Sequence, residues 1–393
     1  MAVVEILPPR GAPALARPLE LIAIALVVAQ AVYLLVSYWQ GTWIIGVDGK
    51  GVASDFVNVW AAGKLALQGT PAAAYDWPIH KSIEELAVGH PFEGYFGWHY
   101  PPPFLAVAAL LALFPYGASY IVWLAATLPF YVAMVRATIA GQGAVLLALA
   151  FPALLSNFVV GQNGFLTAAL IGGALLLIER GRPLAAGVLI GLLTYKPHMG
   201  LLFPIVLAAS GQWRVFFSAA VTAALMALAS LLLFGADTWL AFFNSIAHTS
   251  QAFLSDGWAN FGKLQTLFGL TRALGGGETL AWTLQTALAL LSALIVSLIW
   301  RGRSSFEIKA AALATGAMLA TPYLYTYDLV VLAVPLAFLY RRGRRDGVLS
   351  YEAGGIGAAC ALIASFPFVT APVGFAAVLI VAALVLRRAL RPA

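Results

Sequence analysis

Within GVLIGLLTYKPHMGLLFPIVLAAS, residues Gly187–Ser210, a positive charge at Lys196 interrupts a sequence that is otherwise apolar enough for a lipid bilayer. An ionisable residue there is costly unless it faces a cavity or a partner, so Lys196 is a candidate functional residue. The apolar arms run thirteen residues back to Pro183 and thirteen forward to Ala209, and each is shorter than the roughly 20 residues of a span. We expect a broken hairpin around a polar site; the alternative is that the lysine stem snorkels to the headgroups.

The composition sets the class of protein. Of the 393 residues, 62% are hydrophobic and 10% are charged, against about 25% charged in soluble domains. The net charge of +6 comes from short arginine clusters between apolar runs, as the positive-inside rule predicts, so we expect a lipid bilayer and no nucleic acid as partner. The single cysteine, Cys360, excludes an internal disulfide and a multi-cysteine metal site.

The apolar runs predict an all-α polytopic membrane protein with about twelve transmembrane helices, within about 11 to 13. Alternation of about thirteen full spans from a cytoplasmic N-terminus would place Arg180 and Arg182 outside. We therefore expect that the short, proline-flanked run Pro102–Phe114 does not cross. The clusters expected in the cytoplasm are Arg136, Arg180/Arg182, Arg214, Arg301/Arg303, Arg341 to Arg345 and Arg387/Arg388/Arg391.

The N-terminal apolar run, Leu19–Tyr38, follows Arg10 and Arg17. Its length of about 20 residues suits a membrane span and exceeds a typical signal-peptide core, so we expect it to stay uncleaved despite the small-x-small pattern at Ala29–Ala31. Arg17 then places the N-terminus in the cytoplasm, and twelve crossings would place the C-terminus there as well. Residues 1–393 form one membrane domain, and its longest polar segments, 40–100 and 235–279, fall on the extracytoplasmic face.

The first of these polar segments contains an aspartate that is a candidate functional residue. Asp55 begins a stretch in which Phe56, Val59 and Gly63 recur at helical spacing, which predicts an amphipathic helix on the membrane surface. The alternative is that Asp55 only caps this helix, although Ser54 could cap it equally well. The other acids of the loop are expected to be mostly solvated: Asp48, Asp76, Glu84, Glu85 and Glu93.

Two further motifs carry side chains suited to sugars. Tyr100 stands among Trp98, His99 and a proline run, where the chain is stiff; it is either a wall for a sugar or lipid head or an interfacial anchor. Gln162 and Asn163 could bind sugar hydroxyls through paired donors and acceptors, or could satisfy the backbone of a tight turn.

In this order the motifs resemble those of glycosyltransferase family 87, membrane enzymes of the C-type superfamily that include bacterial mannosyltransferases using polyprenyl-phosphate-mannose. The matching pieces are Asp55 with Asn58–Ala62 and Gly69, Tyr100–Pro102, Gly161–Asn163, Arg180–Arg182 with Ala186, Gly187 and Gly191, Lys196–Pro197, and Trp213–Arg214. The resemblance implies a GT-C-type fold, a catalytic aspartate at Asp55 and a lipid-linked sugar donor.

The late part of the chain departs from that family's pattern. Where family members often carry a histidine after a Ser-Pro pair, this chain has Thr321-Pro322 followed by Tyr323. A neutral phenol cannot act as a cation at a phosphate. Tyr327 and Asp328 in the same segment are candidate sugar or acceptor contacts.

With Asp55 as general base, these residue types fit a single displacement that inverts the anomeric carbon. The resemblance implies that the sugar is a hexose, mannose in family members, carried on a polyprenyl phosphate, and we expect an extracytoplasmic glycolipid or glycan acceptor. Lys196 with His198 is the first candidate for the donor phosphate, followed by Lys263 and Arg272. Neither a His-x-x-x-His pair, nor an Asp-x-Asp pair, nor a nucleotide-binding loop occurs in the sequence, so we expect no metal and no cofactor. The expected location is the bacterial plasma membrane.

Two other classes of protein remain as alternatives. A secondary transporter or flippase would also contain broken helices and buried charge. A non-catalytic lipid-binding or assembly protein would tolerate substitution of Asp55.

Overall fold

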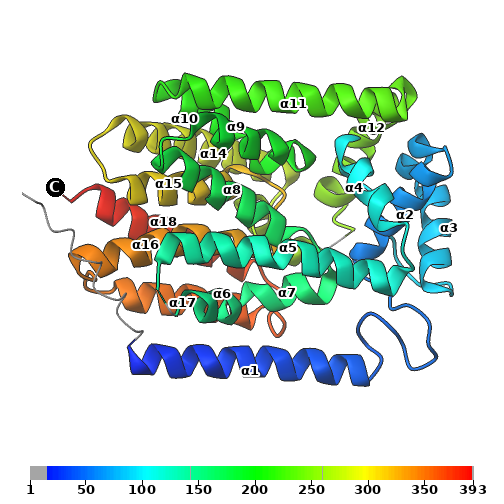
Figure 1. The fold of residues 1–393 in the computed structure, drawn as a ribbon, viewed down its shortest axis with the longest axis horizontal. Helices are drawn as coiled ribbons and strands as arrows, with labels where there is room; N and C mark the ends of the chain where they lie inside the picture. The colour runs from blue at the N-terminus through cyan, green and yellow to red at the C-terminus, as the bar shows by residue number, and fades with distance from the viewer. Residues whose placement is uncertain (1–15, 142, 259, 392–393) are drawn as a thin grey trace, which may run out of the picture.

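The computed structural model describes residues 16–391 except 142 and 259, and the residues described form helices and no strand (Figure 1). The all-α prediction is confirmed. The α-helices are α1 (Arg17–Trp39), α2 (Phe56–Leu67), α3 (Trp77–Val88), α4 (Pro103–Leu111), α5 (Tyr116–Ile139), α6 (Ala144–Ala150), α7 (Ala153–Val160), α8 (Gly164–Glu179), α9 (Pro183–Leu192), α10 (Leu202–Ala209), α11 (Trp213–Phe234), α12 (Ala236–Ser250), α13 (Leu267–Ala273), α14 (Glu278–Arg301), α15 (Phe306–Ala320), α16 (Ala333–Asp346), α17 (Glu352–Ser365) and α18 (Val373–Ala389). Short 3-10 or π-helical segments join them at η1 (Pro71–Tyr75), η2 (Leu193–Tyr195), η3 (Pro197–Met199), η4 (Gln251–Ser255), η5 (Phe261–Lys263) and η6 (Thr326–Leu332).

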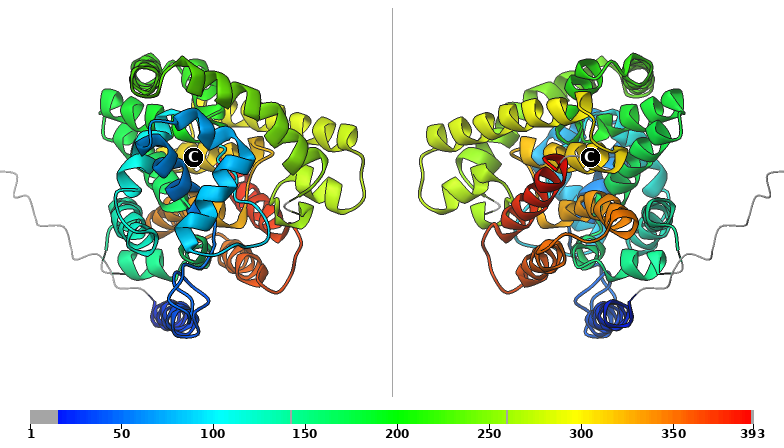
Figure 2. Two further views of the ribbon diagram at one scale, coloured as in Figure 1. Left: turned by 90° about the vertical axis from the view of Figure 1, so that its right-hand side faces the viewer. Right: turned by 90° about the vertical axis from the view of Figure 1, so that its left-hand side faces the viewer.

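Four helices in the described part of the chain, α1, α5, α11 and α14, are long and apolar enough to cross a membrane. A helix of 24 residues, such as α5, is about 36 Å long, which exceeds the roughly 30 Å of bilayer hydrocarbon. α1 and α11 lie along opposite edges of the bundle (Figures 1 and 2) and expose large apolar side chains. Such surfaces are stable in lipid rather than in water.

The other predicted spans form shorter helices, because prolines and polar turns divide them. Ala144–Val160 is broken at Phe151-Pro152 into α6 and α7, and the Lys196 segment is broken into α9 and α10 by two single turns. Twelve crossings therefore stay a prediction. Arg10 and the residues before 16 lie outside the described part of the chain.

Helix α4, within the run Pro102–Phe114, agrees in length with the prediction that this segment does not cross. Its 9 residues extend about 14 Å, less than half of a bilayer core. α4 packs against α2 at the end of the bundle that also carries α3 and α12 (Figure 1).

The expected helix after Asp55 forms as α2, but it is not a surface helix. Nine of its 12 residues are buried, and it packs against α3, α4 and η1. Its sequence, FVNVWAAGKLAL, is apolar on most sides, so burial rather than amphipathic docking is the lower-energy arrangement. The correction places Asp55 inside the protein rather than at a lipid surface.

Two of the predicted cytoplasmic arginine clusters, Arg341 to Arg345 and Arg387/Arg388/Arg391, form ion pairs that join helix ends. The ends of α8, α16 and α18 meet the starts of α15 and α17, at the end of the bundle away from α2 and α3 (Figure 1). The pairs are Arg341–Glu179 at 2.5 Å, Arg345–Glu307 at 3.2 Å and Arg388–Glu352 at 2.6 Å. The side of the membrane that this end faces stays a prediction.

Helix α1 lies at the margin of the bundle, where Figure 2 shows it end-on. It packs against α6, and its buried Gln30 donates a hydrogen bond from Nε2 to the carbonyl of Leu149 at 3.2 Å.

The α2–α4 contact depends on a glycine. A Cβ on Gly63 would lie 2.0 Å from the carbonyl oxygen of Ala108, a distance at which the two backbones must separate. We expect Gly63→Ala to lower the melting temperature by several degrees and to reduce the yield of folded protein.

The control is Gly354→Ala, because a Cβ at Gly354 in α17 has no neighbour within 4 Å and alanine favours helix. Equal melting temperatures for Gly63→Ala and wild type, measured by light scattering on detergent-purified protein, would contradict the packing argument.

Candidate active site

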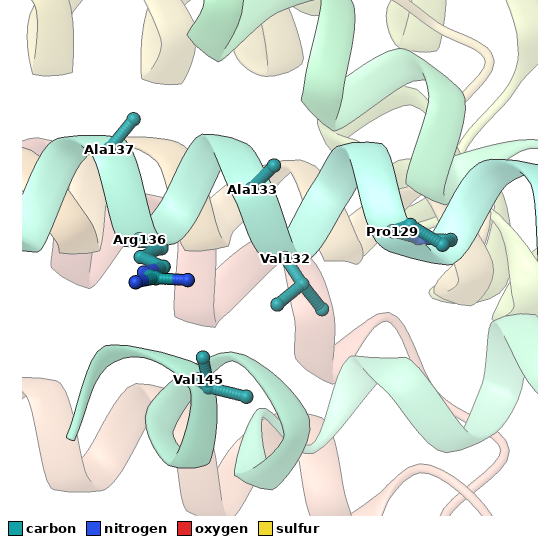
Figure 3. Close-up of a pocket in the computed structure, with 6 residues that line it drawn as sticks. All are labelled: Pro129, Val132, Ala133, Arg136, Ala137 and Val145. Carbon is teal, nitrogen blue, oxygen red and sulfur yellow. The ribbon is translucent and has the colours of Figure 1, made fainter. Parts of the chain in front are cut away.

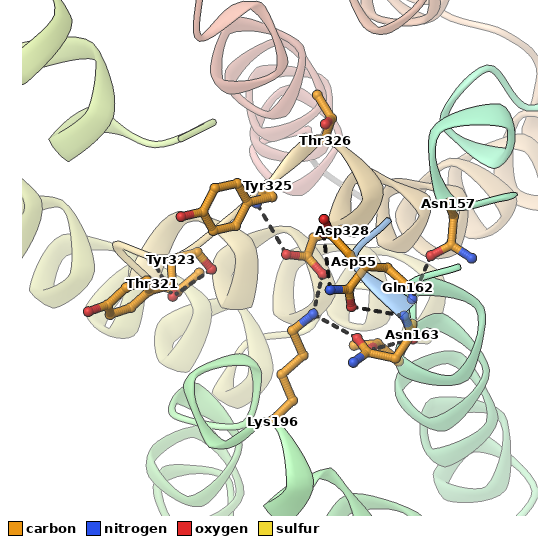
Figure 4. A network of polar contacts seen from close by, with 12 residues as sticks. Asp55, Asn157, Gln162, Asn163, Lys196, Thr321, Tyr323, Tyr325, Thr326 and Asp328 are labelled. Carbon is orange, nitrogen blue, oxygen red and sulfur yellow. Dashed lines mark hydrogen bonds and ion pairs between the residues drawn. The ribbon is translucent and has the colours of Figure 1, made fainter. Parts of the chain in front are cut away.

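Asp55 lies at the start of α2, and its carboxylate faces the interior instead of the helix end. Its side chain caps no backbone N–H of α2. Its Oδ2 accepts a hydrogen bond from Gln162 Nε2 at 3.2 Å (Figure 4). The Ser54 hydroxyl lies 3.2 Å from the Tyr116 hydroxyl. The geometry thus differs from the capping alternative and frees the carboxylate for other contacts.

Gln162 and Asn163 occupy the turn between α7 and α8. Gly161 adopts φ +67, which favours glycine, and a Cβ there would lie 2.7 Å from Phe56 at the start of α2. Asn157 caps α8, because its Oδ1 accepts the Gly164 N–H at 2.8 Å. The amides of Gln162 and Asn163 are thereby available to other side chains, although Gln162 Oε1 also accepts the Asn163 N–H at 3.3 Å.

Tyr100 joins these two amides. Its hydroxyl donates to Gln162 Oε1 at 2.9 Å and accepts from Asn163 Nδ2 at 2.7 Å. Its carbonyl accepts a bond from the Tyr75 hydroxyl at 2.9 Å. Tyr100 therefore faces the protein interior, which differs from the interfacial-anchor alternative.

Lys196 occupies the break between η2 and η3, as the sequence predicts, and is 4% exposed. Its Nζ donates to Asn163 Oδ1 at 2.8 Å and forms an ion pair with Asp328 (Figure 4). The Tyr327 ring lies with its centroid 5.3 Å from the same nitrogen. The ammonium is held inside the bundle by protein partners, so it does not snorkel.

Asp328 comes from η6, far along the chain from Lys196. Its second oxygen, Oδ2, accepts the backbone N–H of Tyr325 at 3.1 Å. η6 lies close to the start of α8 because Gly164 has no Cβ. A Cβ at this position would lie 2.4 Å from the Tyr327 carbonyl oxygen. Both carboxylate oxygens of Asp328 have partners in the protein, and its role as a sugar or acceptor contact stays a prediction.

One continuous chain of side-chain contacts, the site network, results from these interactions. It connects five segments that are distant in sequence, and Figure 4 shows the side chains of Asp55, Gln162, Asn163, Lys196 and Asp328 converging. Its members, in contact order, are Asp55, Gln162, Tyr100, Asn163, Lys196 and Asp328.

The remaining predicted cations lie outside the network. The His198 ring packs 6.1 Å from Tyr323 and its buried Nε2 has no hydrogen-bond partner among the described residues. Lys263 is exposed on η5 and lowers the pKa of Asp55 through its charge. Arg272 donates to the carbonyls of Ser255 at 2.7 Å and Gly276 at 3.2 Å. Arg272 thus organises the second long loop.

Burial controls the electrostatics of Asp55. Loss of solvation raises the pKa of this carboxyl to about 6, while the Gln162 hydrogen bond and the charge of Lys263 oppose the rise. At pH 7 most of the carboxylate is ionised, yet it is far more basic than a solvated aspartate. No group of three histidine, cysteine or acidic side chains among the described residues is placed to hold a metal ion.

A groove elsewhere in the molecule is separate from the network. Figure 3 shows it between α5 and α6. Its lining residues are Pro129, Val132, Ala133, Arg136, Ala137 and Val145.

Comparison with known proteins identifies the family. The family model described as glycosyltransferase family 87 matches residues 98–322. The chain belongs to this family. The protein is therefore a membrane glycosyltransferase, as the resemblance implies, and the family favours the enzyme over the transporter and the scaffold. No curated protein and no solved structure matches the chain.

The matched range of this glycosyltransferase contains Tyr100, Gln162, Asn163 and Lys196 but not the two aspartates. Asp55 precedes the range and Asp328 follows it. The structure brings both into contact with residues of the matched region.

Sequence reasoning missed a buried pair in α3. Glu84, expected to be solvated, is fully buried in α3, and its Oε1 lies 3.5 Å from Nε2 of the equally buried His80. The signal was the spacing of four residues, which places both on one helix face. Burial raises the pKa of Glu84 to about 8 and lowers that of His80 to about 3, so both are mainly neutral at pH 7.

This pair makes stability depend on pH. Folded Glu84 keeps its proton up to about pH 8, whereas the unfolded side chain releases it near pH 4.5. The free energy of unfolding therefore falls as pH rises through this window, by at most about 1.4 kcal/mol per pH unit. Below pH 6.5 the buried neutral His80 has the opposite effect, so the interval from pH 6.5 to 8 isolates Glu84.

We expect Glu84→Gln, which resembles the protonated acid, to reduce the fall in melting temperature between pH 6.5 and 8. Glu85→Gln, at the adjacent and partly exposed position, serves as control and should keep the wild-type dependence. The same fall in all three proteins would show that Glu84 titrates outside this interval.

Proposed function

We propose that this glycosyltransferase transfers a hexose, mannose by the family resemblance, from a polyprenyl-phosphate-linked donor to an acceptor hydroxyl outside the cytoplasm. One observation carries the proposal: a basic carboxylate at Asp55 and a buried ammonium at Lys196 stand at two points of a single hydrogen-bonded network. The carboxylate can accept the proton of an acceptor hydroxyl, and the ammonium can stabilise the charge of a leaving phosphate.

The reaction is a single displacement. The acceptor oxygen forms a bond to the anomeric carbon while the bond from that carbon to the phosphate oxygen breaks, and the phosphate keeps the electron pair. Asp55 takes the acceptor proton, and the pKa of about 6 makes it an effective base near neutral pH. The product glycoside has the inverted configuration, and the lipid leaves as polyprenyl phosphate.

The leaving phosphate gains charge as its bond to the sugar breaks, so it needs donors or cations at that point. The Lys196 ammonium has three N–H donors, and its contacts with Asn163 and Asp328 use two of them. The third is available for a phosphate oxygen. The exposed Lys263 and the unpartnered Nε2 of His198 are further contacts that a phosphate could take up.

The sugar contacts in this proposal come from the middle of the network. Gln162, Asn163 and Tyr100 present amide and hydroxyl groups between the base and the ammonium, and the Tyr327 ring lies beside that ammonium. Asp328 holds Lys196 in place. The donor carries its own phosphate, so the proposal requires no nucleotide and no resident cofactor.

The proposed location is the bacterial plasma membrane, with both termini and the arginine clusters in the cytoplasm and about twelve crossings. The segments 40–100 and 235–279, which contain α2, α3 and α12, then face the extracytoplasmic side. The separation of the arginine ion pairs from that end of the bundle supports this orientation.

We expect Asp55→Asn to lower turnover at least about 100-fold, since general-base catalysis contributes ~10²–10⁴, while donor binding persists. In wild type, transfer should fall on the acid side with an apparent pKa near 6, because the base is then protonated. The measurement is transfer from radiolabelled polyprenyl-phosphate-mannose to endogenous acceptors in membranes of a deletion strain.

Asp237→Asn, at an exposed carboxylate in the first turn of α12, is the matched control and should keep full activity. Product formation by equally expressed Asp55→Asn at the wild-type rate would remove Asp55 as the base. Absence of product from wild type with this donor would contradict the donor assignment.

A test of the role of Lys196 requires a variant that still folds. Removal of one member of a buried ion pair typically costs about 3–5 kcal/mol, so we would neutralise both with Lys196→Gln and Asp328→Asn together. The doubly substituted protein should melt near the wild-type temperature but lose about 100-fold in kcat/KM for the donor, as when one preorganised donor is removed. A folded double variant with wild-type kcat/KM would refute the phosphate contact.

A further inference from the structure

Two polar segments of the chain meet through aromatic rings beside the site network. Trp77, the first residue of α3, has its ring centroid 4.3 Å from His248, 4.7 Å from Tyr95 and 5.3 Å from Trp258. His99 and Phe253 complete the group, with centroids 4.9 Å apart. We call this group the loop aromatic cluster; its members are Trp77, Tyr95, His99, His248, Phe253 and Trp258.

Some rings of the loop aromatic cluster are exposed at the surface of the protein. Trp258 is 61% exposed, and His248 is exposed as well. Exposed carboxylates stand at its margin: Asp76 precedes Trp77 and caps α3, and Asp256 lies near Trp258 and accepts a bond from Gln251. Flat rings with polar groups around them suit a pyranose, which has apolar C–H faces and hydroxyls at its rim.

The cluster adjoins the site network through consecutive residues. His99 packs within the cluster, and its Nδ1 lies 3.2 Å from the Thr249 hydroxyl of α12, whereas Tyr100 belongs to the network. The prolines that follow hold this segment stiff. The cluster and the network therefore meet at two neighbouring residues of one stiff segment.

We propose that the loop aromatic cluster is a carbohydrate subsite that binds a pyranose ring of the acceptor, at a distance from the hydroxyl that reacts. The acceptor is then a glycan with more than one sugar, rather than a simple alcohol or lipid. This inference rests on the proposed function for the reaction, but the binding itself does not require catalysis.

The arrangement favours a sugar over a lipid headgroup. Aromatic residues that anchor proteins in membranes are spread along the interface as belts, whereas these rings come from two segments and pack on one another. The two carboxylates at the margin also repel anionic headgroups.

The test measures saturation-transfer NMR signals of mannotriose and of maltotriose, each with the full chain in phosphatidylcholine nanodiscs. We expect signals with wild type and equally with Asp55→Asn. Trp258→Ala should reduce them by about fivefold or more, as expected for loss of one stacked ring. Trp213→Ala removes an indole that is 50% exposed in α11 and should leave them unchanged.

The variants should fold, because both tryptophans are largely exposed; wild-type melting temperatures verify this. Absence of signal from both trisaccharides with wild type would overturn the subsite. Equal signals from wild type and Trp258→Ala would overturn it too, because the sugar would then bind without this ring. Failure of Asp55 as the base would leave the NMR signals unaltered, so the two proposals fail separately.

Discussion

The architecture depends on the burial of a lysine and an aspartate in the interior of an apolar helical bundle. Transfer of an ion from water to such an interior is unfavourable, and only a close partner with further hydrogen bonds compensates for it. Lys196 and Asp328 supply that partnership, and Asn163 and the Tyr325 backbone complete it. To satisfy these contacts, the break between α9 and α10, the α7–α8 turn and η6 must all meet at one point.

The rest of the site is arranged around that point. Asn163 contacts the ammonium through its oxygen and the Tyr100 hydroxyl through its nitrogen, so one planar amide links the donor side to the acceptor side. Tyr100 and Gln162 extend the link to Asp55.

The sequence predicted most of these participants because polar side chains are conspicuous in apolar runs. Lys196, Asp55, Tyr100 and the Gln162–Asn163 pair were all recognised from local context and from the family's motifs, and the structure places them in one network. Local context could not predict the burial of α2 or Glu84, because burial depends on what packs against a helix. Nor could it predict that Asp328 pairs with Lys196, because 132 residues separate them.

In helix α1, a single buried polar side chain positions an otherwise apolar helix against its neighbour. Its leucine, isoleucine and valine side chains are largely exposed, and a smooth apolar rod can slide along a neighbour in hydrocarbon at little cost. The Gln30 amide prevents this sliding, because its bond to the Leu149 carbonyl has no water to compete with it. The bond thus fixes the axial register of α1 against α6, and the segment that leads on to Asp55 begins from a helix in a defined register.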